Sequence, residues 1–237
     1  MVKSVKIYNN FNIKSKHKNS IILIGNFDGL HLGHQKLFNL AQNFKKKYSL
    51  KIGVMTFEPM PKMFFNKNLN NFRISNQKQK ITLLKKFDVD FIIVKKFDKK
   101  FSKTKSINFI KDILSNRLGA KFIFVSNNFR FGNKREGNVK QLIQYETLYN
   151  YKIIKPKPLS KNKKIISSTL IRKYLENGKL DKANKFLNRN KSGSESGDTK
   201  ATPLFDSLKN GCVPIYLGPR NVNEYIPENC LIDLALF

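Results

Sequence analysis

Short apolar runs alternate along this chain with longer stretches in which apolar residues recur every three or four positions. The runs predict strands at residues 21–24, 51–57, 91–94, 122–125 and 152–154. The longer stretches predict helices at 34–47, 75–87, 106–118, 139–149, 167–177 and 181–187. Strands that alternate with helices in this way are typical of an α/β fold, in which helices cover both faces of a parallel sheet.

Polar residues and glycines mark where these elements begin and end. Ser75 and Ser106 are expected N-caps, because a serine hydroxyl can accept a hydrogen bond from a backbone N–H of the first helical turn. Gly119 suits the position just after a helix. Loops rich in Gly, Asn and Ser follow the strands, at the edge where open parallel sheets bind their ligands.

The most informative of these loops follows the first strong apolar run, as Gly25-Asn-Phe-Asp-Gly-Leu-His-Leu-Gly-His34. Its glycines let the backbone turn sharply and come close to a ligand. A strand, a glycine-rich loop and a helix N-terminus together form an anion site, because unpaired N–H groups and the helix dipole point outward. His31 and His34 are three residues apart, so both rings can project to one side. The loop therefore predicts phosphate chemistry.

Each polar residue of this loop also has a plainer interpretation. The two histidines could cap the helix, lie in solvent or form half of a metal site, although no Cys or carboxylate cluster completes such a site and His17 is remote. Asn26 could donate to phosphates. Asp28 could position Mg²⁺ or fix the loop, and these two roles are equally compatible with the sequence.

Three further segments carry candidate chemistry. Residues 166–172, Ile-Ser-Ser-Thr-Leu-Ile-Arg, place hydroxyls at a helix start and Arg172 one turn later, which fits either phosphate binding or an ordinary cap with a surface arginine. Residues 56–61, Thr-Phe-Glu-Pro-Met-Pro, form a rigid strand end that suits a flat aromatic ligand or a simple turn. Residues 127–132, Asn-Asn-Phe-Arg-Phe-Gly, combine amides with aromatic rings that could flank such a ligand.

The charge of +30 would ordinarily indicate a nucleic-acid or membrane partner. Here 39 of the 46 basic residues are lysines scattered over every segment, which indicates a compositional bias, so neither nucleic acid nor a membrane is expected as a partner. Against that background the seven arginines stand out, since lysine does not reproduce a bidentate guanidinium. No run approaches the ~18 apolar residues of a membrane span and no signal peptide is recognisable, so a cytoplasmic protein is expected.

The C-terminal part differs from the rest. Residues 1–190 hold 42 basic against 10 acidic residues, whereas residues 191–237 hold 4 against 6 and contain both cysteines, Cys212 and Cys230. Residues 191–203 begin with a polar Gly/Ser stretch typical of a linker. The division predicts a domain over 1–190, a linker over 191–203 and a separate segment over 204–237.

Taken together, the four segments resemble the FMN adenylyltransferase module of bacterial bifunctional riboflavin kinase/FAD synthetases, a branch of the His-x-Gly-His nucleotidyltransferases. The resemblance covers roughly residues 5–190 and implies a Rossmann-like sheet that transfers AMP from ATP to FMN with Mg²⁺. It implies catalytic roles for His31, His34, Asn26 and Arg172. It implies ATP contacts for Gly25, Phe27, Asp28, Gly33, Ser167, Ser168 and Thr169. It implies flavin contacts for Phe57, Pro59, Pro61, Asn128 and Phe131.

The chain departs from the family pattern at several points. Met60 stands where the family often has His, and Ser126 replaces a frequent Gly. No segment like the riboflavin kinase module follows residue 190, so no kinase activity is expected. Residues 205–227 instead resemble a fragment of the nucleotide-sugar-binding domain of α1,3-fucosyltransferases, too short to bury its own core. The alternatives are therefore a fucosyltransferase-related protein or a basic RNA- or membrane-binding protein. Oligomeric state and magnesium ligands are not predicted.

Overall fold

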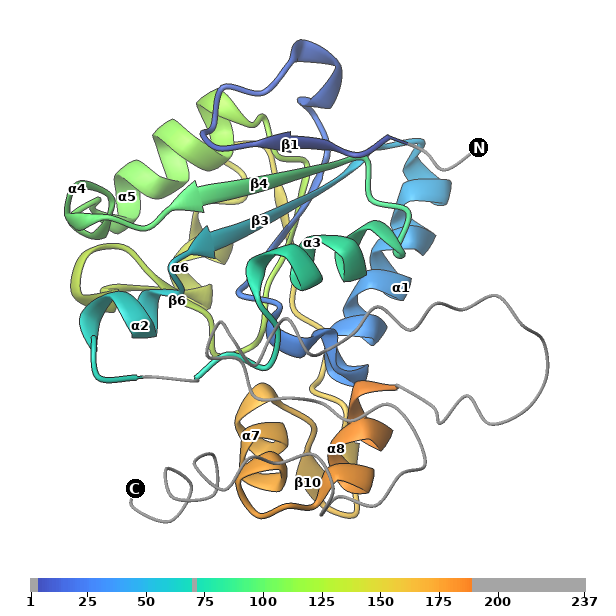
Figure 1. The fold of residues 1–237 in the computed structure, drawn as a ribbon. Coiled ribbons are helices and arrows are strands. Elements are labelled where there is room, and N and C mark those ends of the chain that lie inside the picture. Colours follow the sequence, from blue (N-terminus) through green and yellow to red (C-terminus); the bar gives the residue numbers. More distant parts are fainter. Residues whose placement is uncertain (1–3, 70–71, 189–237) are drawn as a thin grey trace.

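The computed structural model describes residues 4–69 and 72–188, so the predicted linker, the fucosyltransferase-like segment and both cysteines lie outside the described residues. Its centre is a six-stranded parallel sheet in the order β1-β4-β3-β2-β5-β8 (Figure 1). The strands are β1 Lys6–Tyr8, β2 Ile21–Ile24, β3 Ile52–Glu58, β4 Phe91–Lys96, β5 Phe122–Phe124 and β8 Lys152–Ile154. The α/β fold with a parallel sheet is therefore confirmed.

Helices connect the parallel strands, as parallel pairing requires. They are α1 Leu32–Tyr48, α2 Pro61–Phe65, α3 Gln77–Lys85, α4 Lys99–Ser102, α5 Ser106–Asn108, α6 Val139–Gln144, α7 Ser168–Glu176 and α8 Leu180–Leu187. Single turns of 3₁₀ helix occur as η1 Ser15–His17, η2 Asp28–Leu30 and η4 Asn133–Arg135, and η3 Phe109–Arg117 is a π-helix. Two small antiparallel hairpins, which the apolar pattern did not indicate, pair β6 Arg130–Phe131 with β7 Gly137–Asn138 and β9 Ser160–Lys161 with β10 Lys164–Ile165.

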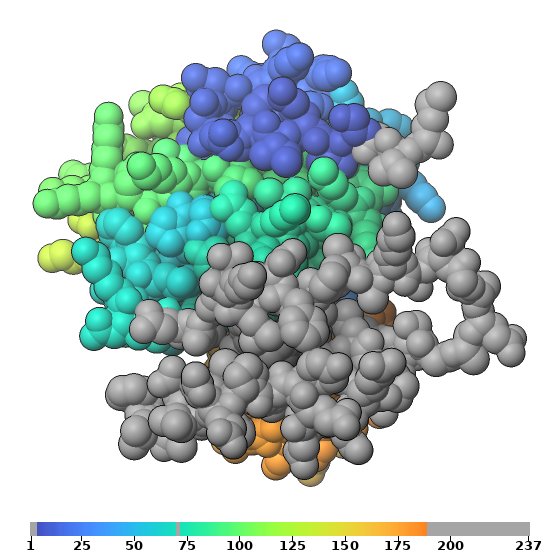
Figure 2. All heavy atoms as spheres, in the orientation of Figure 1, coloured from blue at the N-terminus to red at the C-terminus, as the bar shows by residue number. Residues whose placement is uncertain are grey.

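The sheet is buried on both faces, which explains why its strands read as continuous apolar runs. One face packs against α1 and α3 through a cluster that includes Leu23, Val54, Phe38 and Leu84. The other face packs against η3 and α6 through residues such as Ile24, Met55, Ile110 and Leu142. β1 is an edge strand of the sheet and pairs with β4. Figure 2 shows the dark blue N-terminal segment at the surface, beside green residues.

A third, smaller core joins the C-terminal helices to the sheet domain. Ile171 and Leu175 of α7 pack with Ala183 and Leu187 of α8 and with Ile74, which precedes α3. Figure 1 shows α7 and α8 side by side in orange, beyond the N-terminal end of α1. This small core brings the segment after residue 166 close to the segment before α3.

Three local expectations need correction. Asn76, not Ser75, caps α3, since its side chain accepts from the Gln79 backbone N–H and the Gln79 side chain accepts in return from the Asn76 N–H. The helix expected at 106–118 starts with Ser106 inside its first turn, after Lys105, and continues as the π-helix η3. The helix expected at 139–149 ends at Gln144.

Candidate active site

The histidine loop connects β2 to α1 at the carboxyl edge of the sheet. The backbone turns through Phe27 at φ 48° and Gly29 at φ 77°, and His31 then caps α1. His31 Nδ1 accepts from the His34 N–H at 3.4 Å, a weak cap, and the two rings stack with centroids 3.7 Å apart. The cap explains the extended His31 backbone, and the stacking confirms that both imidazoles lie on one side of the helix start.

Burial sets the protonation of this pair. It lowers the pKa of His31 to about 4, with Asp28 raising and Arg172 lowering that value. The pKa of His34 is held well below its usual value by burial of its ring and by the neighbouring His31. Both rings are therefore neutral near pH 7. His34 Nδ1 is buried and has no hydrogen-bond partner within the described part of the chain, an unusual state for a polar atom.

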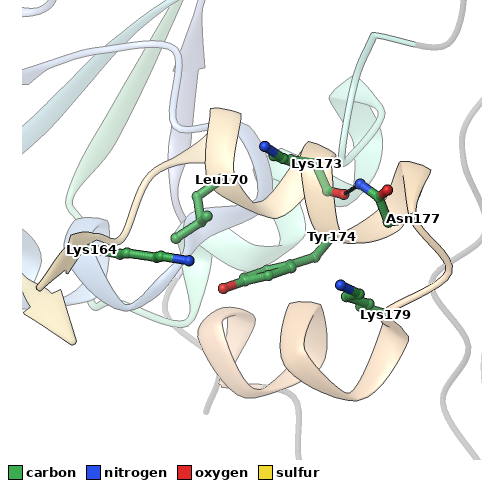
Figure 3. A pocket seen from close by; sticks show the side chains of 6 residues that line it. All are labelled: Lys164, Leu170, Lys173, Tyr174, Asn177 and Lys179. Carbon is green, nitrogen blue, oxygen red and sulfur yellow. Dashed lines mark hydrogen bonds between the residues drawn. The ribbon is translucent and has the colours of Figure 1, made fainter. Parts of the chain in front are cut away.

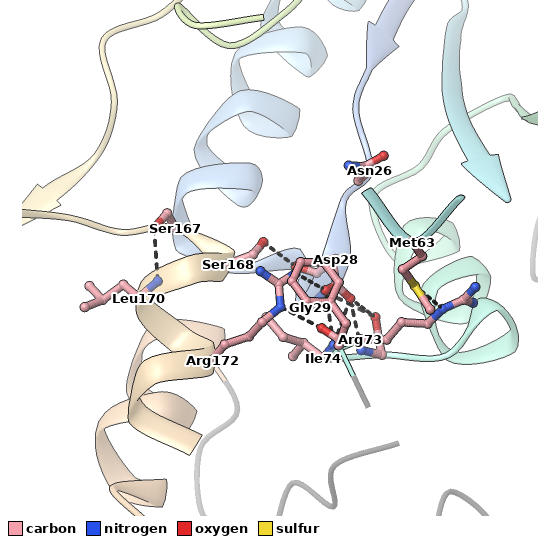
Figure 4. Close-up of polar contacts among 12 residues, drawn as sticks. Asn26, Asp28, Gly29, Met63, Arg73, Ile74, Ser167, Ser168, Leu170 and Arg172 are labelled. Carbon is pink, nitrogen blue, oxygen red and sulfur yellow. Dashed lines mark hydrogen bonds and ion pairs between the residues drawn. The ribbon is translucent and has the colours of Figure 1, made fainter. Parts of the chain in front are cut away.

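The side chain of Asp28 ties the loop to two other segments (Figure 4). Its carboxylate accepts from the backbone N–H groups of Ile74 and Ser75 at 3.1 Å and from Arg172 Nη2 at 2.7 Å. The side chain is only 4% exposed, so these contacts engage a desolvated charge. Of the two roles that the sequence left open for Asp28, the structure therefore supports fixing the loop.

The segment at 166–172 meets the loop from the opposite side. Ser167 is the N-cap of α7 and accepts from the Leu170 N–H, while the Ser168 hydroxyl donates to the Asp28 carbonyl at 3.0 Å. Arg172 also donates from Nε to the Phe72 carbonyl at 2.6 Å and stacks over the Phe72 ring. Thr169 is exposed beside them. The first and second predicted segments are thus brought together, and Arg172 is a partner of the loop's own carboxylate.

The remaining loop residues divide between support and surface. The Asn26 side chain is exposed, and its backbone carbonyl accepts from the Thr56 hydroxyl at 3.3 Å. The Phe27 ring is 1% exposed and packs edge-on against His34 and Phe38, so it supports the histidines from below. At Gly33, a Cβ would come within 3.1 Å of the His31 ring, and at Gly25 one would come within 3.1 Å of the Phe27 ring. Both glycines therefore leave room for the aromatic residues of the loop.

The two segments predicted to face an aromatic ligand are linked by a chain of phenylalanine rings. Phe57 stacks on Phe101, which contacts Phe109, and Phe109 in turn contacts Phe131, whose ring stacks on Phe129. Centroid separations along this chain run from 5.3 to 6.4 Å, the range of favourable ring pairs. The strand ends of β3 and β5 therefore share one aromatic base.

Polar and proline residues flank that aromatic base. Pro59 follows a cis peptide bond after Glu58, and Pro61 starts α2. Asn128 is exposed and accepts from the Ser126 hydroxyl at 3.0 Å. Met60, in place of the family's frequent His, is 2% exposed and is therefore a packing residue here.

Several supporting residues were missed by sequence reasoning. Arg73 forms a two-pronged ion pair with Glu58 at the end of β3. Lys80, only 3% exposed, donates from Nζ to the Thr56 hydroxyl at 3.2 Å. Arg73 could have been singled out in the sequence as one of the few arginines. Nothing in the sequence distinguishes Lys80, because lysine is abundant in this chain.

A separate hollow of about 280 Å³ lies along α7 (Figure 3). It is lined by Lys164, Leu170, Lys173, Tyr174, Asn177 and Lys179. None of the sequence-predicted site residues lines it. Across residues 4–69 and 72–188, no group of three or more His, Cys, Asp or Glu side chains could hold a metal ion, and no helix has the length and apolar character needed to span a membrane.

Comparison with known proteins identifies the family of this chain. The family model described as FAD synthetase matches residues 13–170, which contain β2 to β5, both hairpins and the histidine loop. The chain belongs to the FAD synthetase family. The match ends inside α7, two residues before Arg172.

Curated relatives and one solved structure extend the comparison. The chain is 43% identical to the bifunctional riboflavin kinase/FMN adenylyltransferase of Buchnera aphidicola subsp. Acyrthosiphon pisum, over 75% of this chain and 57% of the relative. It is 34% identical to the protein of the same name from Escherichia coli K12, over 70% of this chain and 53% of the relative. A crystal structure titled as a macrolide-efflux protein from Streptococcus pneumoniae superposes with a TM-score of 0.68 at 27% identity, over 78% of this chain and 60% of that one. The chain thus spans little more than half the length of these bifunctional relatives.

Proposed function

We propose that this chain is an FMN adenylyltransferase that transfers AMP from ATP to FMN, releasing pyrophosphate and forming FAD. The observation that carries the proposal is the stacked, neutral His31–His34 pair at the carboxyl edge of the sheet, with one buried ring nitrogen unpartnered in the described chain. A neutral imidazole can donate to a phosphate oxygen and gains a proton more readily once an anion is beside it. Membership of the FAD synthetase family supports the same reaction.

In this reaction an oxygen of the FMN phosphate attacks the α-phosphorus of ATP. The bond from the α-phosphorus to the bridging oxygen breaks, and the electron pair leaves with pyrophosphate, so no covalent enzyme intermediate is needed. Catalysis then consists of alignment and stabilisation of charge on the phosphates. We assign His31, His34 and Asn26 to the ATP phosphates, with Ser168 and Thr169 beside them and Arg172 acting mainly through Asp28.

The second half of the site would hold the flavin. Phe57 of β3 and Phe131 of β6 belong to the same aromatic chain, and Pro59, Pro61 and Asn128 follow the ends of β3 and β5. Rigid apolar walls with a few amides suit a flat, polar-edged ring system. We therefore place FMN on the β3–β5 side of the histidines and ATP over the start of α1.

Magnesium is expected as part of the ATP substrate. The one carboxylate of the histidine loop, Asp28, is engaged by Arg172 and by two backbone N–H groups, so it does not fit the role of a magnesium ligand. Mg²⁺ is commonly held by substrate phosphates and retained water. We therefore propose that the ion arrives bound to ATP. A reaction on ATP and FMN also fits the cytoplasmic location expected from the sequence.

The test is direct formation of FAD. Purified protein is incubated with FMN and Mg-ATP, and products are separated by HPLC, with a parallel reaction that contains riboflavin in place of FMN. We expect an FAD peak and pyrophosphate from FMN, and no FMN from riboflavin. Folded protein that yields no FAD would contradict the proposal. Salt-sensitive RNA binding by such inactive protein would favour the alternative of a basic binding protein.

A further inference from the structure

A small group of buried or half-buried charged side chains around the histidine loop carries more positive than negative charge. Arg172 pairs with Asp28, and Arg73 pairs with Glu58. Lys80 lies close enough to both carboxylates for them to affect its charge, yet it has an ion pair with neither in the described residues. Three cations therefore stand against two carboxylates, and the two histidines add no charge while they are neutral.

Lys80 is the member of this group without a matched partner. It is 3% exposed on α3, and its Nζ donates to the hydroxyl of Thr56, which is itself fully buried on β3. Burial is also the main influence lowering the pKa of Lys80, against the opposing effect of Glu58 and Asp28. An ammonium ion held by one neutral hydroxyl loses much of its hydration without full compensation, so it is costly for the fold.

The Thr56 hydroxyl, which accepts a hydrogen bond from Lys80, also contacts the histidine loop. Thr56 Oγ1 donates to the Asn26 carbonyl at 3.3 Å, so the Lys80 ammonium and the Asn26 peptide are joined through one side chain. Asn26 follows Gly25 just after β2, and its side chain is exposed. Lys80 therefore supports the loop near its start, at Asn26, as Arg172 supports it at Asp28.

We propose that Lys80 is a positioning residue for adenylyl transfer, which fixes the Asn26 peptide through Thr56 and contributes the positive charge that phosphates of the substrate offset. The inference rests on the proposed function and adds a residue to it. A substrate carrying phosphates supplies the negative charge that this group lacks. A lysine that serves only the fold would instead be expected to stabilise the protein.

The test compares Lys80→Met, Lys80→Arg and Thr56→Val with Lys78→Met, a matched control at an exposed position on the same helix. For Lys80→Met we expect kcat to fall at least about tenfold, with KM for ATP changed less than about threefold, because alignment acts mainly in the transition state. Lys80→Arg should recover most of the lost turnover, and Thr56→Val should lose several-fold. Lys78→Met should match the wild type.

Stability separates the functional role from a structural one. The urea midpoint of Lys80→Met should equal or exceed that of the wild type, because a costly buried charge is removed. A folded Lys80→Met with wild-type kcat and KM would overturn the inference, as would a Lys80→Arg no more active than Lys80→Met. Should Lys80→Met fail to fold, Thr56→Val decides the matter, and wild-type turnover in that variant would overturn it.

Failure of the proposed function gives a different result. Wild-type protein that forms no FAD would refute adenylyl transfer, and the role of Lys80 is then judged by ATP binding in equilibrium dialysis. Weaker ATP binding by Lys80→Met than by wild type and Lys78→Met would support the charge role. Equal binding by all three proteins would overturn it.

Discussion

Arg172 Nη2 lies 2.7 Å from Asp28 Oδ2, which joins the histidine loop to a helix 144 residues later in the chain. The two side chains are 16% and 4% exposed, and Arg172 is further held by the Phe72 carbonyl and ring. Because the carboxylate also receives two backbone N–H groups, one ion pair organises three separate segments. This contact is the basis of the first prediction.

Removing the charge of Asp28 should destabilise the protein strongly. Asp28→Asn leaves the Arg172 guanidinium without its counter-charge in a largely buried position, at a cost of about 3 kcal/mol in the free energy of unfolding. Arg172→Lys keeps a charge but loses the Phe72 contacts and should cost about 1–2 kcal/mol. Urea denaturation measures both, with the exposed Lys173→Met as control. An Asp28→Asn protein as stable as the control would contradict the assigned role.

Gly29 in the histidine loop and Gly178 after α7 form a matched pair of positions for testing how tightly the loop is packed. Both have a left-handed backbone, at φ 77° and 63°, but a Cβ at Gly29 would lie 2.8 Å from the Ile74 side chain, whereas nothing lies within 4 Å of one at Gly178. Gly178→Ala should cost about 1 kcal/mol from backbone strain alone. Gly29→Ala should cost at least about 1 kcal/mol more. Equal losses in thermal or urea unfolding would show that the space around Gly29 is not restrictive.

The lowered histidine pKa values predict acid sensitivity. Below the usual pKa of 6.5 the unfolded chain binds a proton at His31, while the folded protein takes it up only near pH 4. The free energy of unfolding therefore decreases as the pH falls from about 6.5 toward 4, by an amount on the order of 2 kcal/mol for this group. His31→Asn removes the titrating group but keeps an N-cap residue. Its unfolding energy should depend less on pH over this interval than that of the wild type, and an unchanged dependence would refute the assignment.

Loss of the imidazole itself should reduce catalysis. His31→Ala is expected to lower FAD formation at least about tenfold, because one donor to the phosphates is removed from a desolvated site. Circular dichroism and the urea midpoint establish that the variant is folded. Unchanged turnover in folded protein would remove His31 from the phosphate role.

The predicted domain division can be tested by truncation. Deletion of residues 191–237 should leave adenylyl transfer intact, because the catalytic segments and the three cores all lie before residue 189. Steady-state kinetics of the shortened and full-length proteins provide the comparison. A folded truncation without activity would show that the C-terminal segment takes part in the reaction.

Five of the six strands of the central sheet, all but β1 Lys6–Tyr8, and the positions of the four site segments could be predicted because each carries a strong local signal. The apolar runs at residues 21–24 and 122–125 allow little besides buried strands, and β2 and β5 are adjacent in the sheet. The loop from Gly25 to His34 combines three glycines with two of three histidines. Its stacked imidazoles follow from the spacing and from the start of α1. Membership of the FAD synthetase family confirms the resemblance on which the site roles were based.

What could not be predicted depends on contacts between distant segments. The contacts by which Asp28 fixes the loop come from Arg172 and from the backbone of Ile74 and Ser75, and no local pattern specifies those partners. Ser75 lost its expected capping role for the same reason, since its backbone and hydroxyl serve Asp28 and Gly29 instead. Lys80 is buried by the fold, and no charge pattern separates it from its exposed neighbour Lys78.

The pairing of Asp28 with a residue in α7 also has a consequence for the order in which the molecule is built. When β2 and the histidine loop leave the ribosome, the guanidinium that neutralises Asp28 has not yet been synthesised, and the Ser168 hydroxyl that holds its carbonyl is missing as well. Unlike the central strands, which can pair as soon as they emerge, the loop reaches its final form only after α7 has docked. The histidine loop therefore reaches its final contacts late, although it is one of the first segments of the described chain to be synthesised.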